Sequence, residues 1–254
     1  MDRTIVKIGL VYILTGFIVH TALDIGSLFF LEHSAVYKSV RLSLCSILTS
    51  LIAIRYGMRK ISLRYSDLFK VKIGASSVAL TALSFIAIIS LIFVSLSIIS
   101  KLNIEDNKQD ELLNNFYYSP IGIISGIVIF PILEEILSKG IFLNLLLKEY
   151  SVGKSIIIVS IFFGIMHLGT GSYTPVHTTI LSIIVSYLYI STKSVLPCIA
   201  LHMFNNGSAY ILDYIDREYY AIPPSTGWVC IPVLLISIYY MRKNYSQYII
   251  VKSE

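Results

Sequence analysis

Residues 73–100 read IGASSVALTALSFIAIISLIFVSLSIIS and contain no charged side chain. A helix needs about 20 mostly apolar residues to cross the hydrocarbon core of a bilayer. The stretch is longer than that, and it lacks the alternation of apolar and polar residues that is typical of membrane barrel strands. It therefore predicts a transmembrane helix.

The composition of the whole chain extends this prediction. Of its 254 residues, 56% are hydrophobic and 14% are charged, and the mean hydropathy is +0.77. A soluble domain carries roughly 25% charged and about 45–50% apolar residues. The chain has too few charges to cover a surface in water, which argues against solenoids and disordered tails. The net charge of +5 lies in short connectors, so no nucleic-acid partner is expected, and the lipid bilayer is the expected surroundings.

Seven further apolar stretches resemble the first. Gly and Pro inside them are acceptable, because transmembrane helices tolerate both. We expect an all-α, polytopic transmembrane bundle of about eight helices in a single domain of residues 1–254. The expected spans are residues 8–31, 36–54, 73–100, 120–147, 155–168, 175–191, 195–212 and 226–241. The first contains His20 and Asp24 and no cleavage site, so it is interpreted as an uncleaved helix rather than a signal peptide.

The connectors predict the orientation. Residues 55–72 carry six basic side chains and one acidic one, whereas residues 101–119 hold four acidic side chains. Because cytoplasmic loops are rich in Lys and Arg, both termini are expected in the cytoplasm. The basic connector is either an amphipathic segment on the membrane surface or a solvated loop. AT-rich codon usage, indicated by many Ile, Lys, Tyr, Ser and Asn residues, favours a bacterial plasma membrane.

Ionisable residues inside the expected spans are candidates for function. A charge at the bilayer centre costs on the order of 2.5–3.5 kcal/mol, so such residues usually face the bundle interior. Five stand out, and His20 and Asp24 form a weaker set. The five are Glu134, Glu135, Lys139, His167 and His202.

Adjacent side chains on a helix point about 100° apart, so Glu134 and Glu135 cannot easily share one role. Glu135 and Lys139 are four residues apart, the spacing of a helical ion pair, which would neutralise both. Glu134 is then available for chemistry as a general base, and Pro131 can kink or open its helix. The alternative is two ion-paired or interfacial glutamates without a catalytic role.

The two histidines belong to similar short patterns. Phe163 lies one turn before His167, where an aromatic ring can pack the imidazole. Asn206 lies one turn after His202, and a His/Asn pair in one cavity offers donors to an oxyanion. Either histidine alone is more often a packing residue in a helix, but Glu, His, His and Asn on three spans favour a catalytic site.

These motifs, Glu134-Glu135-x-x-x-Lys139, Phe163-x-x-x-His167 and His202-x-x-x-Asn206, resemble in order those of the CPBP family. That family contains CAAX prenyl endopeptidases and the bacteriocin-processing or immunity proteins also called Abi. The resemblance covers a core of about residues 119–213. It implies an eight-helix intramembrane protease in which Glu134 and His167 activate water, and His202 and Asn206 hold the oxyanion. Glu135, Lys139 and Phe163 would support the site.

Two features bear on what the resemblance implies. The family pattern has Arg where this chain has Lys139, and lysine lacks the bidentate fork of arginine. The family has also been described as zinc-dependent, with Glu134, His167 and His202 as chemically acceptable ligands. The chain has no HExxH motif, and a metal-free glutamate mechanism is favoured, with zinc as the alternative.

Three hypotheses follow from the sequence. The first is an intramembrane endopeptidase whose partner is a peptide or membrane-protein substrate, such as a bacteriocin or signalling precursor. The second is a non-catalytic immunity or regulatory protein that retains the site. The third, a transporter with a proton relay, is disfavoured because the chain lacks two matching halves.

Overall fold

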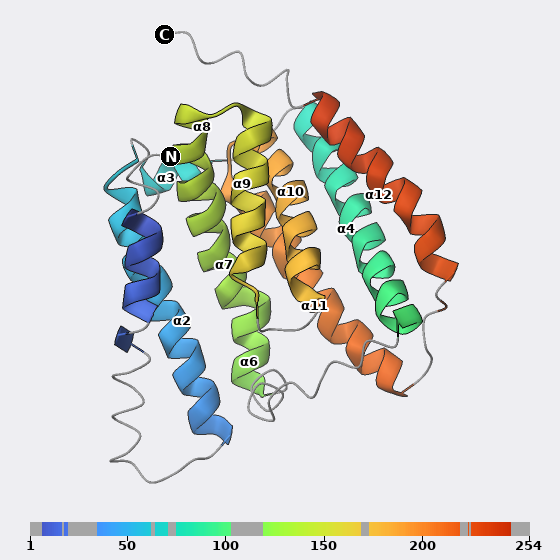
Figure 1. Ribbon diagram of the computed structural model, residues 1–254, viewed down its shortest axis with the longest axis horizontal. Helices are drawn as coiled ribbons and strands as arrows, with labels where there is room; N and C mark the ends of the chain where they lie inside the picture. Colours follow the sequence, from blue (N-terminus) through green and yellow to red (C-terminus); the bar gives the residue numbers. More distant parts are fainter. Residues whose placement is uncertain are drawn as a thin grey trace. The chain divides into compact units, whose positions relative to one another are not determined.

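The computed structural model describes residues 7–16, 18–19, 35–61, 64–70, 75–102, 119–168, 173–218, 223 and 225–244. Throughout these residues the regular secondary structure is helical (Figure 1). The all-α transmembrane bundle predicted from composition is confirmed. His20 and Asp24, the weaker candidates of the first expected span, lie outside the described residues.

Four of the described helices are long and apolar enough to cross a bilayer: Ser77–Ile98, Pro120–Glu149, Thr174–Thr192 and Ser225–Lys243. Each coincides with an expected span. The expected spans 8–31, 36–54 and 155–168 correspond to the shorter apolar helices Lys7–Gly16, Ser43–Met58 and Val152–Ile165. The remaining expected span, residues 195–212, corresponds to α11 (Val195–Glu218). The count of eight spans stays a prediction.

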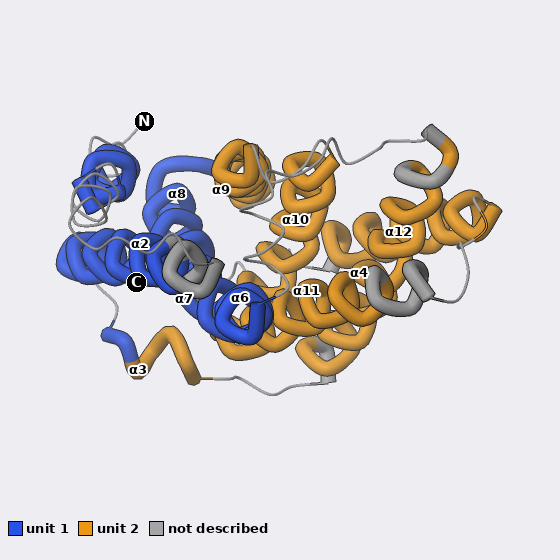
Figure 2. Tube along the Cα trace, turned by 90° about the horizontal axis from the view of Figure 1, so that it is seen from below, with its two compact units in different colours: residues 1–65, 108–151 blue, residues 66–107, 152–254 orange. Residues whose placement is uncertain are grey.

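The chain divides into two compact units (Figure 2). Unit 1 consists of residues 1–65 and 108–151, and unit 2 of residues 66–107 and 152–254. The single domain expected for residues 1–254 stays a prediction, and each unit is a packed body with its own helices.

Unit 1 is built around one long helix, Pro120–Glu149. Ser119 starts it as a side-chain cap, accepting a hydrogen bond from the Gly122 N–H at 3.0 Å, and Pro120 occupies the first turn, where no backbone donor is needed. The helix runs through α6 (Pro120–Ile124), η1 (Ser125–Ile129), α7 (Phe130–Glu135), η2 (Ile136–Leu143) and α8 (Asn144–Glu149).

The stretches η1 and η2 are π-helical, with wider turns than an α-helix. The first ends where Pro131 enters the next turn. Proline has no N–H, and its ring collides with the carbonyl four residues earlier, so a wider turn before it relieves the collision. Helices with such local widening occur frequently at functional sites.

Helix α2 (Ala35–Met58) packs along this long helix within unit 1. The Ser43 and Ser125 hydroxyls share a hydrogen bond of 2.9 Å. Nearer the other end, Gly57 allows a close approach, since a Cβ there would lie 2.8 Å from Ile141 Cγ2. These contacts hold α2 against the helix that carries the acidic pair.

Unit 2 contains α4 (Ala75–Leu102), α9 (Val152–Ile165), α10 (Thr174–Thr192), α11 and α12 (Ser225–Asn244). Helices α4 and α12 lie side by side, and so do α9 and α10 (Figure 1). Helix α10 contacts α4, α9, α11 and α12, which makes it the centre of the unit. Its second half, residues 181–192, is almost entirely buried.

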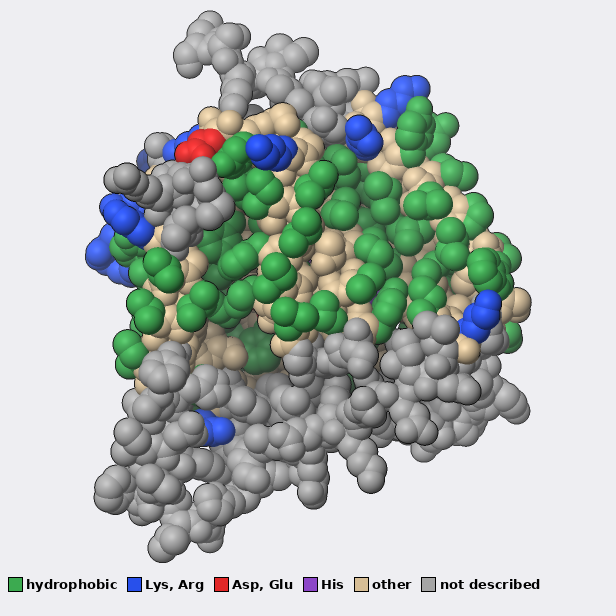
Figure 3. Space-filling view, in the orientation of Figure 1, with side chains coloured by type: hydrophobic (Ala, Val, Ile, Leu, Met, Phe, Trp, Pro, Cys, Tyr) green, Lys and Arg blue, Asp and Glu red, His purple; other side chains and the backbone are tan. Residues whose placement is uncertain are grey.

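Polar and apolar side chains of unit 2 both suit a lipid environment. Ser84 and Ser97 of α4 donate to carbonyl oxygens one turn earlier, so their hydroxyl donors are satisfied within the helix. Large apolar side chains point outward, among them Val229 and Leu235 of α12. The space-filling view shows hydrophobic side chains over most of the described part of the visible face (Figure 3).

Candidate active site

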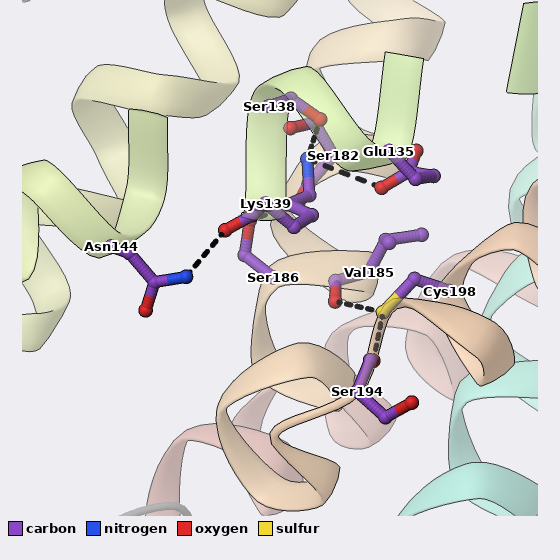
Figure 4. A network of polar contacts seen from close by, with 9 residues as sticks. All are labelled: Glu135, Ser138, Lys139, Asn144, Ser182, Val185, Ser186, Ser194 and Cys198. Atoms are coloured by element: carbon purple, nitrogen blue, oxygen red, sulfur yellow. Dashed lines mark hydrogen bonds and ion pairs between the residues drawn. The ribbon is translucent and has the colours of Figure 1, made fainter. Parts of the chain in front are cut away.

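Glu135 and Lys139 form a buried ion pair in unit 1. Lys139 Nζ lies 3.9 Å from Glu135 Oε2, and the residues are 0% and 1% exposed (Figure 4). The ammonium also donates to Ser138 Oγ at 3.3 Å. The ion pair expected from the four-residue spacing is therefore present, and each charge is compensated where isolation would be costly.

The π-helical turn that carries Lys139 has a polar support of its own. Asn144 Nδ2 donates to the carbonyl oxygens of Lys139, at 3.2 Å, and Gly140, at 2.9 Å. Carbonyl groups in a widened turn lose the regular donor four residues later, so a side-chain amide is a suitable replacement. Asn144 thus stabilises the backbone that presents the lysine.

Glu134 has a different environment from its neighbour. Its side chain is half-buried, whereas Glu135 is fully buried. Within unit 1, Tyr12 lies in electrostatic range of Glu134 and shares a hydrogen bond with Ser50. The more accessible of the two carboxylates is therefore the one outside the ion pair with Lys139.

His167 lies in unit 2, in the turn that follows α9, rather than inside the helix expected over residues 155–168. Its Nδ1 is 2.8 Å from the Phe163 carbonyl oxygen. A carbonyl only accepts, so Nδ1 carries the proton, and in the neutral ring Nε2 then has the lone pair. This tautomer suits a base or a metal ligand.

The Phe163 ring contacts both histidines of the motifs. Its centroid lies 4.8 Å from that of His167 and 5.8 Å from that of His202, the latter in an edge-on arrangement. His202, on α11, is 2% exposed. The spacing of Phe163 and His167 predicted a packed imidazole, and the structure shows one aromatic ring that orients two.

Asn206 lies one turn after His202 on α11 and is half-buried. Its Oδ1 accepts a hydrogen bond of 3.1 Å from Nδ2 of Asn205. Asn205 Oδ1 in turn lies 3.0 Å from His177 Nε2 on α10, and His177 Nδ1 lies 2.8 Å from Ser95 Oγ on α4.

Sequence reasoning missed His177, Asn205 and Ser95. His177 could have been found by the criterion that selected the other histidines, because it is an ionisable residue in an apolar span. No local pattern indicates its partners, since Ser95 is 82 residues away and Asn205 is 28. Only the packing of three helices brings them together.

The predicted site residues divide between the units. Glu134, Glu135 and Lys139 belong to unit 1, and we call them the carboxylate half. The histidine half, in unit 2, consists of Phe163, His167, His202 and Asn206. All seven residues lie in the segment between Ser119 and Tyr210, which is the part of the chain with the most specific motifs.

Residues 115–208 match the family model of Rce1-like type II CAAX prenyl endopeptidases. This Rce1-like segment contains both halves of the candidate site, and the core expected over residues 119–213 stays a prediction. The resemblance to the CPBP family is thereby confirmed. The match shows that this segment is similar to type II CAAX prenyl endopeptidases, and four of the described helices are long and apolar enough to cross a membrane.

The match covers less than half of the chain. No curated protein and no solved structure matches the chain. The roles of individual residues in the Rce1-like segment therefore stay predictions.

The donor groups expected for zinc are those of Glu134, His167 and His202. Among the described residues, no three His, Cys, Asp or Glu side chains form a group that could hold a metal ion. The third donor of the expected zinc set, Glu134, is in unit 1, and the two histidines are in unit 2. Metal-free hydrolysis, with zinc as the alternative, stays a prediction.

Proposed function

We propose that the protein is an intramembrane endopeptidase that hydrolyses a peptide bond of a peptide or membrane-associated substrate. Glu134 and His167 activate the attacking water, and His202 and Asn206 hold the oxyanion. The observation that carries this proposal is the shared contact of Phe163 with His167 and His202, inside the Rce1-like segment.

The first step is the attack of water. The Glu134 carboxylate takes one proton, while His167 Nε2 accepts a hydrogen bond from the same water and orients it. The oxygen of the water bonds to the scissile carbonyl carbon, and the electron pair of the carbonyl moves to its oxygen. Support comes from the tautomer of His167, because the Phe163 carbonyl reserves the lone pair for Nε2.

The second step is collapse of the tetrahedral intermediate. His202 and the Asn206 amide donate hydrogen bonds to its oxyanion, and losing one such donor typically costs about 10²–10³ in rate. The C–N bond then breaks, and the leaving nitrogen takes the proton held by Glu134. Burial of His202 supports this role, because donors act more strongly away from water.

Glu135 and Lys139 support the site and take no part in the reaction. Their mutual neutralisation keeps a charged helix stable inside the bundle and leaves Glu134 as the reactive carboxylate. Lysine in place of the arginine of the family pattern gives a single-point contact of 3.9 Å, which is looser than a bidentate pair. The water-activating groups are separate from this contact.

The substrate class follows from the membrane setting. We expect a short peptide precursor or the end of a membrane-anchored protein, in a bacterial plasma membrane with both termini of the enzyme in the cytoplasm. A prenylated CAAX substrate, which the name of the family model specifies, is the alternative substrate. A non-catalytic immunity or regulatory role is the second candidate function, favoured by Lys139 in place of the family arginine.

Purified protein in liposomes tests the proposal. Two substrate panels are incubated with it: unmodified hydrophobic peptide precursors, and peptides that end in a prenylated cysteine followed by three residues. Products are identified by mass spectrometry in water enriched in ¹⁸O. We expect cleavage with one ¹⁸O in the new carboxyl group, and none with Glu134→Gln.

The isosteric Glu134→Gln change keeps the volume and polarity of the side chain, so abundance and melting temperature should stay at the wild-type values. Equal cleavage by wild type and Glu134→Gln would exclude Glu134 as the base. An intact, folded wild type that cleaves neither panel would favour the non-catalytic role.

A further inference from the structure

Four polar side chains of unit 2 form a continuous chain of hydrogen bonds, which we call the asparagine relay: Ser95, His177, Asn205 and Asn206. It crosses three helices, from α4 through α10 to α11. The successive contacts measure 2.8, 3.0 and 3.1 Å. Only its last member belongs to the family motifs.

We propose that His177 is a positioning residue that sets the orientation of the Asn206 amide. The inference rests on the proposed function, since it explains how the oxyanion donor of that site is aligned. An asparagine amide has an acceptor end and a donor end that differ little in shape. An oxyanion needs the donor end, so the wrong orientation would destabilise the intermediate.

The relay has a direction that decides between the two orientations. His177 Nε2 donates to Asn205 Oδ1, and Asn205 Nδ2 then donates to Asn206 Oδ1. With its oxygen engaged in this way, Asn206 turns its NH₂ group, the end of the amide that carries donors, away from Asn205. The reverse direction would engage the NH₂ of Asn206 and present an oxygen to the oxyanion, which is repulsive.

The far end of the relay is anchored on α4. Ser95 Oγ lies 2.8 Å from His177 Nδ1 and 2.7 Å from the Leu91 carbonyl oxygen of its own helix. Tyr173, at the start of α10, places its hydroxyl 3.2 Å from Ser95 Oγ, and its ring is 6.3 Å from that of His177. The imidazole is thus held on one side by two hydroxyl-bearing residues and on the other by an amide.

The surroundings indicate alignment rather than direct chemistry. Both ring nitrogens of His177 are engaged by protein groups, which leaves neither for a substrate. His167 and His202 lie within electrostatic range of it, so the relay runs beside the histidine half. Asn205 is buried, and its amide uses both ends inside the relay.

The test is a double-mutant cycle on the purified, membrane-reconstituted full chain, with kcat and KM measured for a cleaved peptide. His177→Ala should lower kcat about 10- to 100-fold with little change in KM, because a small displacement of a catalytic group has effects of this size. In an Asn206→Ala background the same change should cost less than about twofold, since the group that it positions is gone.

Two replacements at His177 distinguish positioning from packing. The Nε2 of Gln in His177→Gln can reach the place of the ring Nε2 and donate to Asn205, so this variant should recover most of kcat. His177→Asn is shorter and reaches only toward Ser95, so it should resemble His177→Ala. Thr178→Val is the control on the same helix: its hydroxyl bonds to the Thr174 carbonyl within α10, and kcat should not change.

Equal losses of kcat from His177→Ala with and without Asn206 would overturn the relay, as would equal activity of His177→Gln and His177→Asn. In both cases wild-type cleavage and its loss in Glu134→Gln would leave the proposed function intact. A folded wild type that cleaves no peptide would overturn both. If His177→Ala does not fold, its melting temperature shows this, and the comparison of His177→Gln with His177→Asn then tests the relay.

Discussion

The carboxylate half and the histidine half solve the same problem in different ways. Both place polar groups where a lipid-facing bundle tolerates few of them. In the carboxylate half, opposite charges of Glu135 and Lys139 compensate each other on one helix. In unit 2, hydrogen bonds satisfy the polar groups in and beside the histidine half: His167 bonds to the Phe163 carbonyl within one turn, and His177 bonds to Asn205 between helices.

The difference predicts where each half is vulnerable. An ion pair on one helix forms from local spacing, and removal of either partner leaves a buried charge. A relay across three helices depends on packing, and its failure displaces a donor without exposing a charge. We therefore expect substitutions in the carboxylate half to affect stability more often, and those in the histidine half to affect turnover.

The largest effect should be the difference between substituting Glu134 and substituting Glu135. Glu134→Gln should abolish cleavage at normal abundance, because the base is lost and no ion pair is broken. Glu135→Gln should lower abundance and retain part of the activity, because it leaves Lys139 without its carboxylate. Cleavage rates and protein levels of the two variants measure this contrast, and equal, mild effects would remove the division of labour.

Asn206→Ala should be next in size. Loss of one oxyanion donor typically costs about 10²–10³ in kcat. Substrate binding should change little, since the oxyanion exists only in the transition state and intermediate, so KM should stay within about threefold. Steady-state kinetics on the cleaved peptide provide the measurement. A large rise in KM with unchanged kcat would assign Asn206 to substrate binding.

Lys139 tests the ion pair from the other side. Lys139→Ala leaves Glu135 buried without its cation, a change that costs about 3–5 kcal/mol when a buried pair is broken. Lys139→Arg should be tolerated or should stabilise, because guanidinium bridges a carboxylate with two hydrogen bonds. Thermal unfolding in detergent compares the three proteins. A wild-type melting temperature for Lys139→Ala would show that the pair contributes nothing to stability.

The smallest effect concerns the packing that supports the histidine half. A Cβ at Gly164 of α9 would collide with Thr179 Oγ1 and lie 2.7 Å from the Pro175 carbonyl oxygen of α10. Gly164→Ala should cost about 1–3 kcal/mol, the usual range for overpacking. Gly153→Ala on the same helix meets no atom within 4 Å and should be neutral or slightly stabilising. Gly164→Ala should therefore melt at a lower temperature than Gly153→Ala. Identical melting temperatures would show that α9 and α10 separate freely at this point.

Local parts of the fold and the site were predictable from the sequence. The long apolar stretches predicted helices, and the four-residue spacing of Glu135 and Lys139 predicted their contact, because both depend on neighbours along the chain. The π-helical turns η1 and η2 were not predictable beyond the signal of Pro131, since wider turns depend on packing and on supports such as Asn144. The relay through His177 was missed because its contacts join residues far apart in the sequence.

Metal content and activity of the purified protein test the central claim most directly, namely that side chains of the two halves perform hydrolysis without a metal. Protein is treated with a chelator and dialysed, its metal is measured by mass spectrometry, and its cleavage rate is compared with that of untreated protein. We predict full activity and no stoichiometric metal. Zinc at one per chain, with activity lost on its removal and restored by its return, would contradict the account and reassign Glu134, His167 and His202 as metal ligands.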